Sequence, residues 1–150
     1  MEWQRRCWWV EEMDKPRAGR SQNTRTARMQ AALKHLHTVL QAIYGLNAPR
    51  VVLYGSEARG EATGASDVDI LLIYRHTINR GEEIRRLSAA LAEINLDFGL
   101  VVSVLPIAET EYQTATGPFW MNIQREGVMI ERLVYDIAVL QQTDVNHDRA

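Results

Sequence analysis

Two short apolar segments constrain what this chain can fold into more than any other feature of its sequence. Residues 50–54 and 68–74 are rich in valine, isoleucine and leucine and are bounded by turn residues. Runs of this length and composition are typical of buried β-strands. We expect a third strand over residues 98–105, ended by Pro106, and a short fourth strand over residues 128–130.

Helical periodicity surrounds these strands. Apolar residues recur at three- and four-residue steps over residues 29–44 and again over residues 82–95, which predicts two amphipathic helices. A third helical region, residues 110–126, is interrupted at Gly117-Pro118, and residues 131–142 are expected to form a last helix. Helices and strands in this order predict an α/β (α+β) domain in which helices flank a small mixed β-sheet.

Hydropathy and charge exclude several classes of protein. No run approaches the roughly 20 apolar residues needed to cross a bilayer, and the N-terminus carries no apolar targeting segment, so we expect a soluble, cytoplasmic protein without a membrane partner. Residues 1–28 hold seven basic and four acidic side chains, whereas residues 29–150 hold ten and fifteen. An acidic body is unsuited to general duplex binding, and we expect no direct nucleic-acid partner. It suits a metal ion or a basic partner protein.

The first 28 residues also differ from the rest in pattern. They show no clear period and contain a loop-like stretch around Pro16, so we interpret residues 1–28 as an N-terminal extension ahead of a domain over residues 29–150. Two interpretations stay open: a disordered tail, or an arm that buries its tryptophans against a partner. The lone cysteine, Cys7, excludes an internal disulfide and a cysteine-rich zinc site.

The stretch most informative about chemistry joins the first two predicted strands. Ten residues after Ser56, the sequence reads Ser66-Asp67-Val68-Asp69. Alternate residues on a strand project to the same face, so Asp67 and Asp69 are expected to lie side by side. Two close carboxylates repel each other unless a cation lies between them, and Mg²⁺ prefers such oxygen ligands with other positions left to water and phosphate. Two metal ions bridged by such a pair would stabilise the attacking and leaving oxygens of an in-line phosphoryl or nucleotidyl displacement.

A phosphate-binding turn is predicted beside this acidic pair, in the segment Gly55-Ser56-Glu57-Ala58-Arg59-Gly60. A glycine directly after a buried strand lets ligand atoms approach the backbone closely. Gly55 and Ser56 are therefore expected to hold phosphate oxygens, together with the amides of the following helix. Two roles stay open for Arg59: it neutralises phosphate charge, or it pairs on the surface with Glu57 or Glu61.

Together these residues resemble the signature of the DNA polymerase β-like nucleotidyltransferase superfamily. The sequence motif Gly-Ser-x-Ala-Arg-Gly followed by Ser-Asp-x-Asp resembles that of the smallest members, the minimal nucleotidyltransferases (MNT) encoded beside HEPN-domain toxins. Residues 118–128 resemble the C-terminal portion of that group, and the likeness covers about residues 29–130.

The resemblance implies a fold, ligands and a partner. It implies the small nucleotidyltransferase sheet with flanking helices, ATP held through its triphosphate by Gly55 and Ser56, and Mg²⁺ bound by Asp67 and Asp69. It further implies an antitoxin that transfers AMP from ATP to a tyrosine of its HEPN toxin partner and silences that toxin. Transfer onto a small molecule is disfavoured, because such enzymes usually carry an added acceptor-binding domain.

One position departs from the pattern of the superfamily. Its members supply a third carboxylate from the next strand, as catalytic base and second-metal ligand, and our alignment puts Gly99 at that position. Asp97 lies two residues earlier and on the same face of the predicted strand. Three interpretations stay open: Asp97 serves as the base, the enzyme is weak, or the domain binds nucleotide without turnover and neutralises its partner toxin by binding alone.

Overall fold

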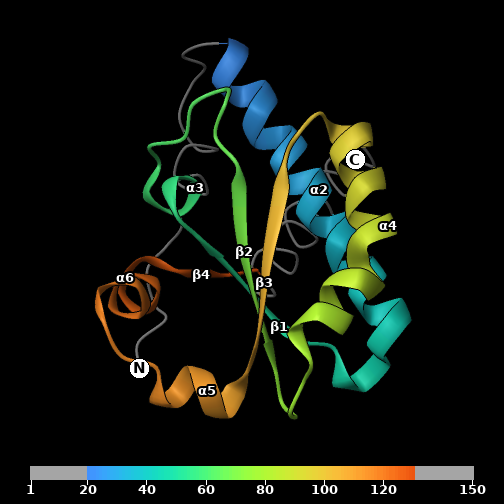
Figure 1. The fold of residues 1–150 in the computed structure, drawn as a ribbon. Helices are drawn as coiled ribbons and strands as arrows, with labels where there is room; N and C mark the ends of the chain where they lie inside the picture. Colours follow the sequence, from blue (N-terminus) through green and yellow to red (C-terminus); the bar gives the residue numbers. More distant parts are fainter. Residues whose placement is uncertain (1–19, 131–150) are drawn as a thin grey trace, which may run out of the picture.

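The computed structural model describes residues 20–130, which form a small β-sheet with helices on both faces (Figure 1). In chain order the elements are α2 (Arg20–Tyr44), the 3-10 helix η1 (Gly45–Asn47), β1 (Arg50–Tyr54), α3 (Ser56–Arg59), β2 (Val68–Tyr74), α4 (Arg80–Phe98), β3 (Val102–Ala108), α5 (Glu109–Thr114), α6 (Pro118–Glu126) and β4 (Val128–Met129). The predicted class, a mixed sheet flanked by helices, is confirmed.

The sheet has four strands in the order β3-β2-β1-β4. β1 runs antiparallel to both β2 and β4, whereas β2 and β3 run parallel. A parallel pair needs a long crossover, and α4 supplies it between β2 and β3. The register places Tyr54 opposite Asp69 and Asp69 opposite Ser103, so these three residues form one row across the sheet.

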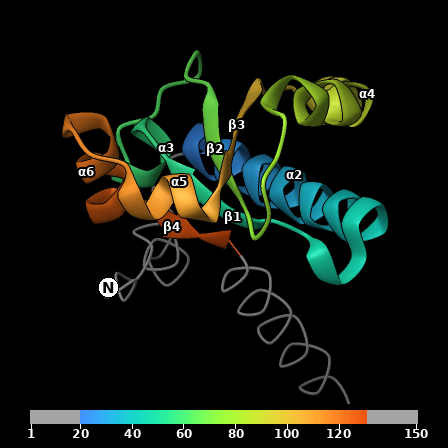
Figure 2. The same ribbon diagram turned by 60° about the horizontal axis from the view of Figure 1, so that its bottom comes forward.

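The two faces of the sheet bury different clusters. Helices α2 and α4 cover one face and α5 and α6 the other, as the turned view makes clear (Figure 2). The larger cluster contains Met29, Leu36 and Leu40 of α2, Leu87 and Ile94 of α4, and Leu53, Ile70 and Leu72 of the sheet. The smaller cluster contains Val52, Leu71, Ile73, Ile107, Tyr112 and Ile123. Side chains alternate along a strand, so Asp69 lies on the face of the smaller cluster.

Several predicted elements have the predicted bounds. The first two strands span residues 50–54 and 68–74, and the helical region after β3 is divided before Pro118, which opens α6. The predicted short strand at residue 128 is present as β4. The predicted helix over residues 82–95 is α4, which begins earlier and ends later.

The predicted third strand is present as β3, but its predicted bounds were wrong. Phe98 is the last residue of α4, and β3 begins at Val102 and runs past Pro106 to Ala108. Phe98 continues the apolar helical stripe of Leu91, and Gly99 ends the helix with a left-handed conformation. β3 accepts a proline because it is an edge strand with a neighbour on one side only. On the open side, no carbonyl of another strand is left without a donor when the backbone N–H is missing.

One helix extends across the expected N-terminal boundary of the domain. α2 begins at Arg20, so the boundary predicted between residues 28 and 29 falls inside one continuous helix. The order of residues 1–19, the environment of Cys7 and the helix predicted over residues 131–142 lie outside the described residues. Within residues 20–130, no helix has the length and apolar character needed to cross a membrane.

Candidate active site

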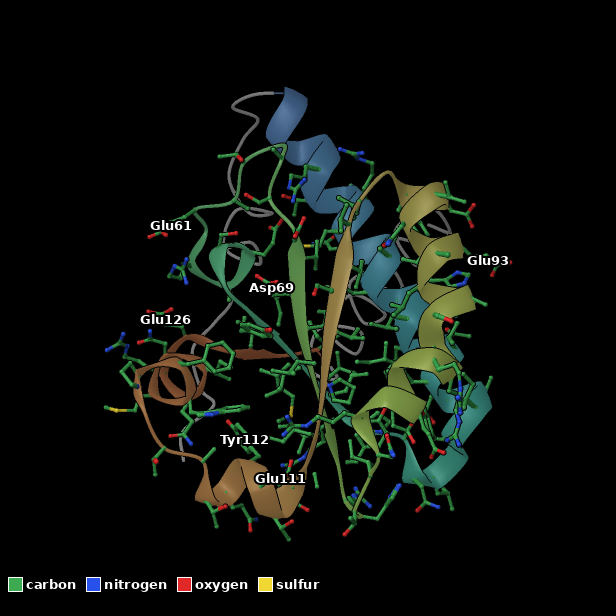
Figure 3. The ribbon with its side chains drawn as sticks, viewed as in Figure 1. Glu61, Asp69, Glu93, Glu111, Tyr112 and Glu126 are labelled. Atoms are coloured by element: carbon green, nitrogen blue, oxygen red, sulfur yellow. The ribbon has the colours of Figure 1, made fainter. Side chains whose placement is uncertain are left out.

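The candidate site lies where β1 and β2 approach each other at the end of the sheet nearest α3. Tyr54, Asp69 and Ser103 form a row across three strands on the face of the smaller cluster, just beyond the apolar floor made by Val52 and Leu71. Side chains directly opposite each other in an antiparallel pair have Cβ atoms only about 4.5–5.5 Å apart. Figure 3 shows Asp69 beside β2 on the side of α3.

Gly55 brings the backbone of the turn against the Asp69 carboxylate. Its φ of 75° and ψ of −153° belong to a region that only glycine enters readily. A Cβ at this position would overlap Asp69 Oδ2 and lie 3.3 Å from Asp69 Cγ. A glycine is therefore needed at position 55 for two reasons: its backbone conformation is strained for other residues, and a Cβ would overlap the Asp69 carboxylate.

The two carboxylates of the acidic pair repel each other, and the charge of Arg59 offsets only part of this effect at Asp69. Burial raises the pKa of the Asp69 carboxyl, the neighbouring Asp67 carboxylate raises it further, and Arg59 lowers it. Burial and the charge of Asp69 also raise the pKa of the Tyr54 hydroxyl. Asp67 is exposed and Asp69 half-buried, and the structure gives neither carboxylate a hydrogen bond or ion pair within residues 20–130. Two such oxygen groups fit a divalent cation that brings its remaining ligands as water and substrate phosphate.

Ser56 and Arg59 lie on the short helix α3, which Gly60 ends. Ser56 is the first residue of this helix and directly follows Gly55, whose backbone lies against Asp69. Arg59 pairs with Glu61 at 3.0 Å and with Glu126 of α6 at 3.5 Å. Of the two surface partners considered from sequence, Glu61 is therefore found and Glu57 is not.

A hollow of about 150 Å³ opens between α3 and α6. Its lining consists of Tyr54, Gly55, Arg59, Phe119, Asn122, Ile123 and Glu126. The Tyr54 and Phe119 rings meet edge to face with centroids 5.9 Å apart and form one wall. Pockets that enclose drug-sized ligands measure about 300–1,000 Å³, so this hollow fits one ring-sized group rather than a whole nucleotide. Gly55 joins the hollow to Asp69.

Asp97 is not part of this constellation. It lies exposed in the last turn of α4, the helix that packs on the opposite face of the sheet. The charges that act on Asp69 come from Asp67 and Arg59. The prediction that Asp97 shares a strand face with the acidic pair was wrong, because the chain is still helical there, and Gly99 caps that helix instead of occupying a strand.

Ser103 is the residue that sequence reasoning missed. The parallel register places it directly opposite Asp69, at the position on β3 where a third carboxylate would adjoin the pair. Extending the apolar helical spacing through Phe98 to the Gly99 stop would have moved the strand and pointed to Ser103. Among the described residues, no group of three or more histidine, cysteine or acidic side chains is arranged to hold a metal ion.

The sequence matches the nucleotidyltransferase domain family over residues 33–125, which is more than half of the chain. This span contains the Gly55-Ser56 turn, Asp67 and Asp69, and the row across the sheet. The chain therefore belongs to the nucleotidyltransferase domain family. No curated protein sequence matches the chain.

Solved structures with a similar fold include a protein of Sulfolobus solfataricus assigned as a nucleotidyltransferase. It aligns with a TM-score of 0.51 and 20% identity over 75% of this chain and 88% of its own. A toxin–antitoxin structure with AMP-PNP aligns at 0.42 with 18% identity, covering 77% of this chain and 92% of the other. A complex of tri-AMPylated Shewanella oneidensis HEPN toxin with MNT antitoxin aligns at 0.41 with 12% identity, covering 79% and 92%. Only the first of these likenesses is close enough to support the fold, and it supports nothing finer.

Proposed function

We propose that this protein is a Mg²⁺-dependent nucleotidyltransferase that transfers AMP from ATP to a protein hydroxyl. One observation carries the proposal: the backbone of the Gly55-Ser56 turn lies directly against the carboxylate of Asp69, which the neighbouring Asp67 carboxylate repels. A phosphate chain held at the turn would lie beside the carboxylates. Family membership supports the reaction class, and members of this family generally use divalent metal ions.

In the proposed reaction, Ser56 and the backbone of the turn bind the triphosphate, and Asp67 and Asp69 hold Mg²⁺. The acceptor hydroxyl gives its proton to solvent water as its oxygen attacks the α-phosphorus, the bond from that phosphorus to the bridging oxygen breaks, and pyrophosphate leaves with the electron pair of that bond. Bound Mg²⁺ would neutralise the charge that develops on the oxygens of the reacting phosphate. Arg59, which Glu61 and Glu126 hold at the rim of the hollow, would exchange a carboxylate for phosphate.

The acceptor we propose is a tyrosine of a cognate HEPN-type toxin, which would make this protein an antitoxin. The proposed acceptor rests on the sequence motif Gly-Ser-x-Ala-Arg-Gly followed by Ser-Asp-x-Asp, which resembles that of the minimal nucleotidyltransferases. The acceptor hydroxyl would approach the row of Tyr54, Asp69 and Ser103. A cytoplasmic location follows from the same proposal, since both substrates are found there.

A second function is a catalytically weak or inactive domain that neutralises its toxin by binding. Ser103 favours it, because the side chain beside Asp69 on β3 supplies no third carboxylate. Loss of a general base slows a reaction by about 10²–10⁴-fold while leaving phosphate binding possible. The two functions therefore differ in turnover and not in fold.

The test uses ATP labelled in its α-phosphate, Mg²⁺ and the product of the adjacent open reading frame. We expect one or more adenylyl groups on that protein, seen as label and as added mass. The double variant Asp67→Asn/Asp69→Asn should abolish transfer and stay folded, whereas Asp97→Asn, which removes an exposed carboxylate of α4, should transfer normally. Full transfer by the double variant would refute the mechanism. A tight complex without transfer by the wild type would instead support the binding function.

A further inference from the structure

Arg25 of α2 makes four long-range hydrogen bonds to the segment that builds the candidate site. Its Nη2 and Nε donate to Glu57 Oε1 at 2.5 and 3.0 Å. Nη2 also donates to the Ser66 carbonyl at 2.7 Å, and Nη1 to the Gly64 carbonyl at 3.3 Å. All of these partners lie between 32 and 41 residues further along the chain.

The ion pair is withdrawn from water. The Arg25 side chain is 13% exposed and the Glu57 side chain 4%. A guanidinium has a planar fork of donors that can satisfy a carboxylate and carbonyl oxygens at once, which an ammonium group cannot reproduce. Such a buried pair is weak evidence for stability, because desolvation offsets much of the attraction. The positions of the groups that Arg25 connects therefore say more about its role than the stability that the ion pair contributes.

The partners of Arg25 flank the functional residues on both sides. Glu57 follows Ser56 directly on α3, and Ser66 directly precedes Asp67. One side chain therefore connects the turn expected to bind phosphate with the loop that presents the first metal-binding carboxylate. Figure 1 shows the start of α2 beside the loop that joins α3 to β2.

We propose that Arg25 is a positioning residue that fixes Ser56 and Asp67 relative to each other. This inference rests on the proposed nucleotidyl transfer and deepens it. Asp67 is exposed and lies before the first residue of β2, so the sheet ladder alone does not hold it. Within residues 20–130 the hydrogen bonds of Arg25 go to Glu57, Gly64 and Ser66 and not to either aspartate, so it would act through the backbone of the loop.

Arg28 offers a matched control on the same helix. It donates through Nη1 to the carbonyls of Phe98 and Gly99 at 3.2 and 3.3 Å, and so ties α2 to the end of α4 instead of to the site. Arg25→Lys and Arg28→Lys each keep the charge and lose the fork. They therefore separate a general effect of anchoring α2 from an effect on the site.

The kinetic test measures AMP transfer against Mg²⁺ concentration. Loss of groups that orient metal ligands typically costs 10–100-fold in metal affinity or activity, so Arg25→Lys should raise the half-saturating Mg²⁺ concentration by about tenfold or more. Arg28→Lys should leave it within about twofold of the wild type. Equal Mg²⁺ dependence in Arg25→Lys and wild type, or an equal defect in both variants, would overturn the proposal.

A double variant keeps the test valid if single changes at Arg25 prevent folding. Replacing a buried ion pair by apolar side chains of similar volume is often neutral or stabilising, so Arg25→Met/Glu57→Met should fold. It lacks the contacts to Gly64 and Ser66, and we expect the same loss of Mg²⁺ affinity. A fully active double variant would overturn the proposal.

Hydrogen exchange separates this proposal from the proposed function. Amides of residues 61–67 should exchange faster in the Arg25 variants than in the wild type, while those of β1 and β2 stay protected. This outcome without any AMP transfer by the wild type would refute the transferase and leave the positioning role of Arg25 supported. Unchanged exchange in residues 61–67 would refute the positioning role.

Discussion

Replacing Gly55 by alanine tests the contact on which the candidate site depends. The substitution adds one methyl group whose carbon would overlap Asp69 Oδ2 and lie 3.3 Å from Asp69 Cγ. The Asp69 carboxylate would have to turn away from the turn. The substitution would also force an alanine to adopt a φ of 75°, a conformation that residues with a side chain rarely enter. Two effects are therefore expected, a loss of stability and a misplaced carboxylate.

The two effects have different magnitudes and different readouts. Backbone strain of this kind costs about 1–3 kcal/mol, which corresponds to an unfolding temperature about 3–10 °C lower for a domain of this size. A displacement of about 1 Å at a reacting centre can cost about 100-fold in rate. We expect the unfolding temperature of Gly55→Ala to be about 3–10 °C below that of the wild type. We expect the variant to transfer AMP about 100-fold more slowly, measured at a temperature where it is fully folded.

Gly45→Ala provides the control for strain alone. Gly45 has a φ of 58°, no atom lies within 4 Å of the site of its added Cβ, and it follows α2 at the far end of the helix from Arg25. It should lose stability and retain its transfer rate. Gly55→Ala with a rate within about threefold of the wild type would refute the argument, because the carboxylate would then tolerate displacement.

Two further substitutions test the charges of the site. The folded-state pKa of Asp69 is raised above its ordinary value of 3.8. Below pH 3.8 the group is protonated in both states and costs no stability. As the pH rises from 3.8 to the raised folded-state pKa, its ionisation destabilises the ligand-free protein. Asp69→Asn should therefore raise the unfolding temperature at neutral pH without Mg²⁺, and thermal unfolding between about pH 4 and 8 checks it. An unchanged pH dependence would contradict the prediction. Ser103→Asp places a third carboxylate opposite Asp69 and should increase transfer, by up to about 10²-fold if it acts as base. An unchanged rate at saturating Mg²⁺ would show that this position does not limit the reaction.

The sequence predicted the parts of the site that lie close together along the chain. Gly55 and Ser56 follow a strand whose bounds were predicted correctly, and Asp69 belongs to a second such strand. Local patterns are reliable here because apolar runs and turn residues act within a few positions. Asp97 was misplaced because the end of a helix is set by a cap and by tertiary packing, and Phe98 fits both a helical stripe and a strand.

By itself the sequence determined the class of fold, the Gly55-Ser56 turn after β1 and the position of Asp69 on β2, since each depends on residues that are adjacent in the chain. Only the tertiary structure decided which residues stand across from them. The parallel register brought Ser103 opposite Asp69, and the packing of α2 brought Arg25 to the loop before Asp67. Strand register and helix docking depend on how two distant surfaces pack, and no short segment of sequence specifies that.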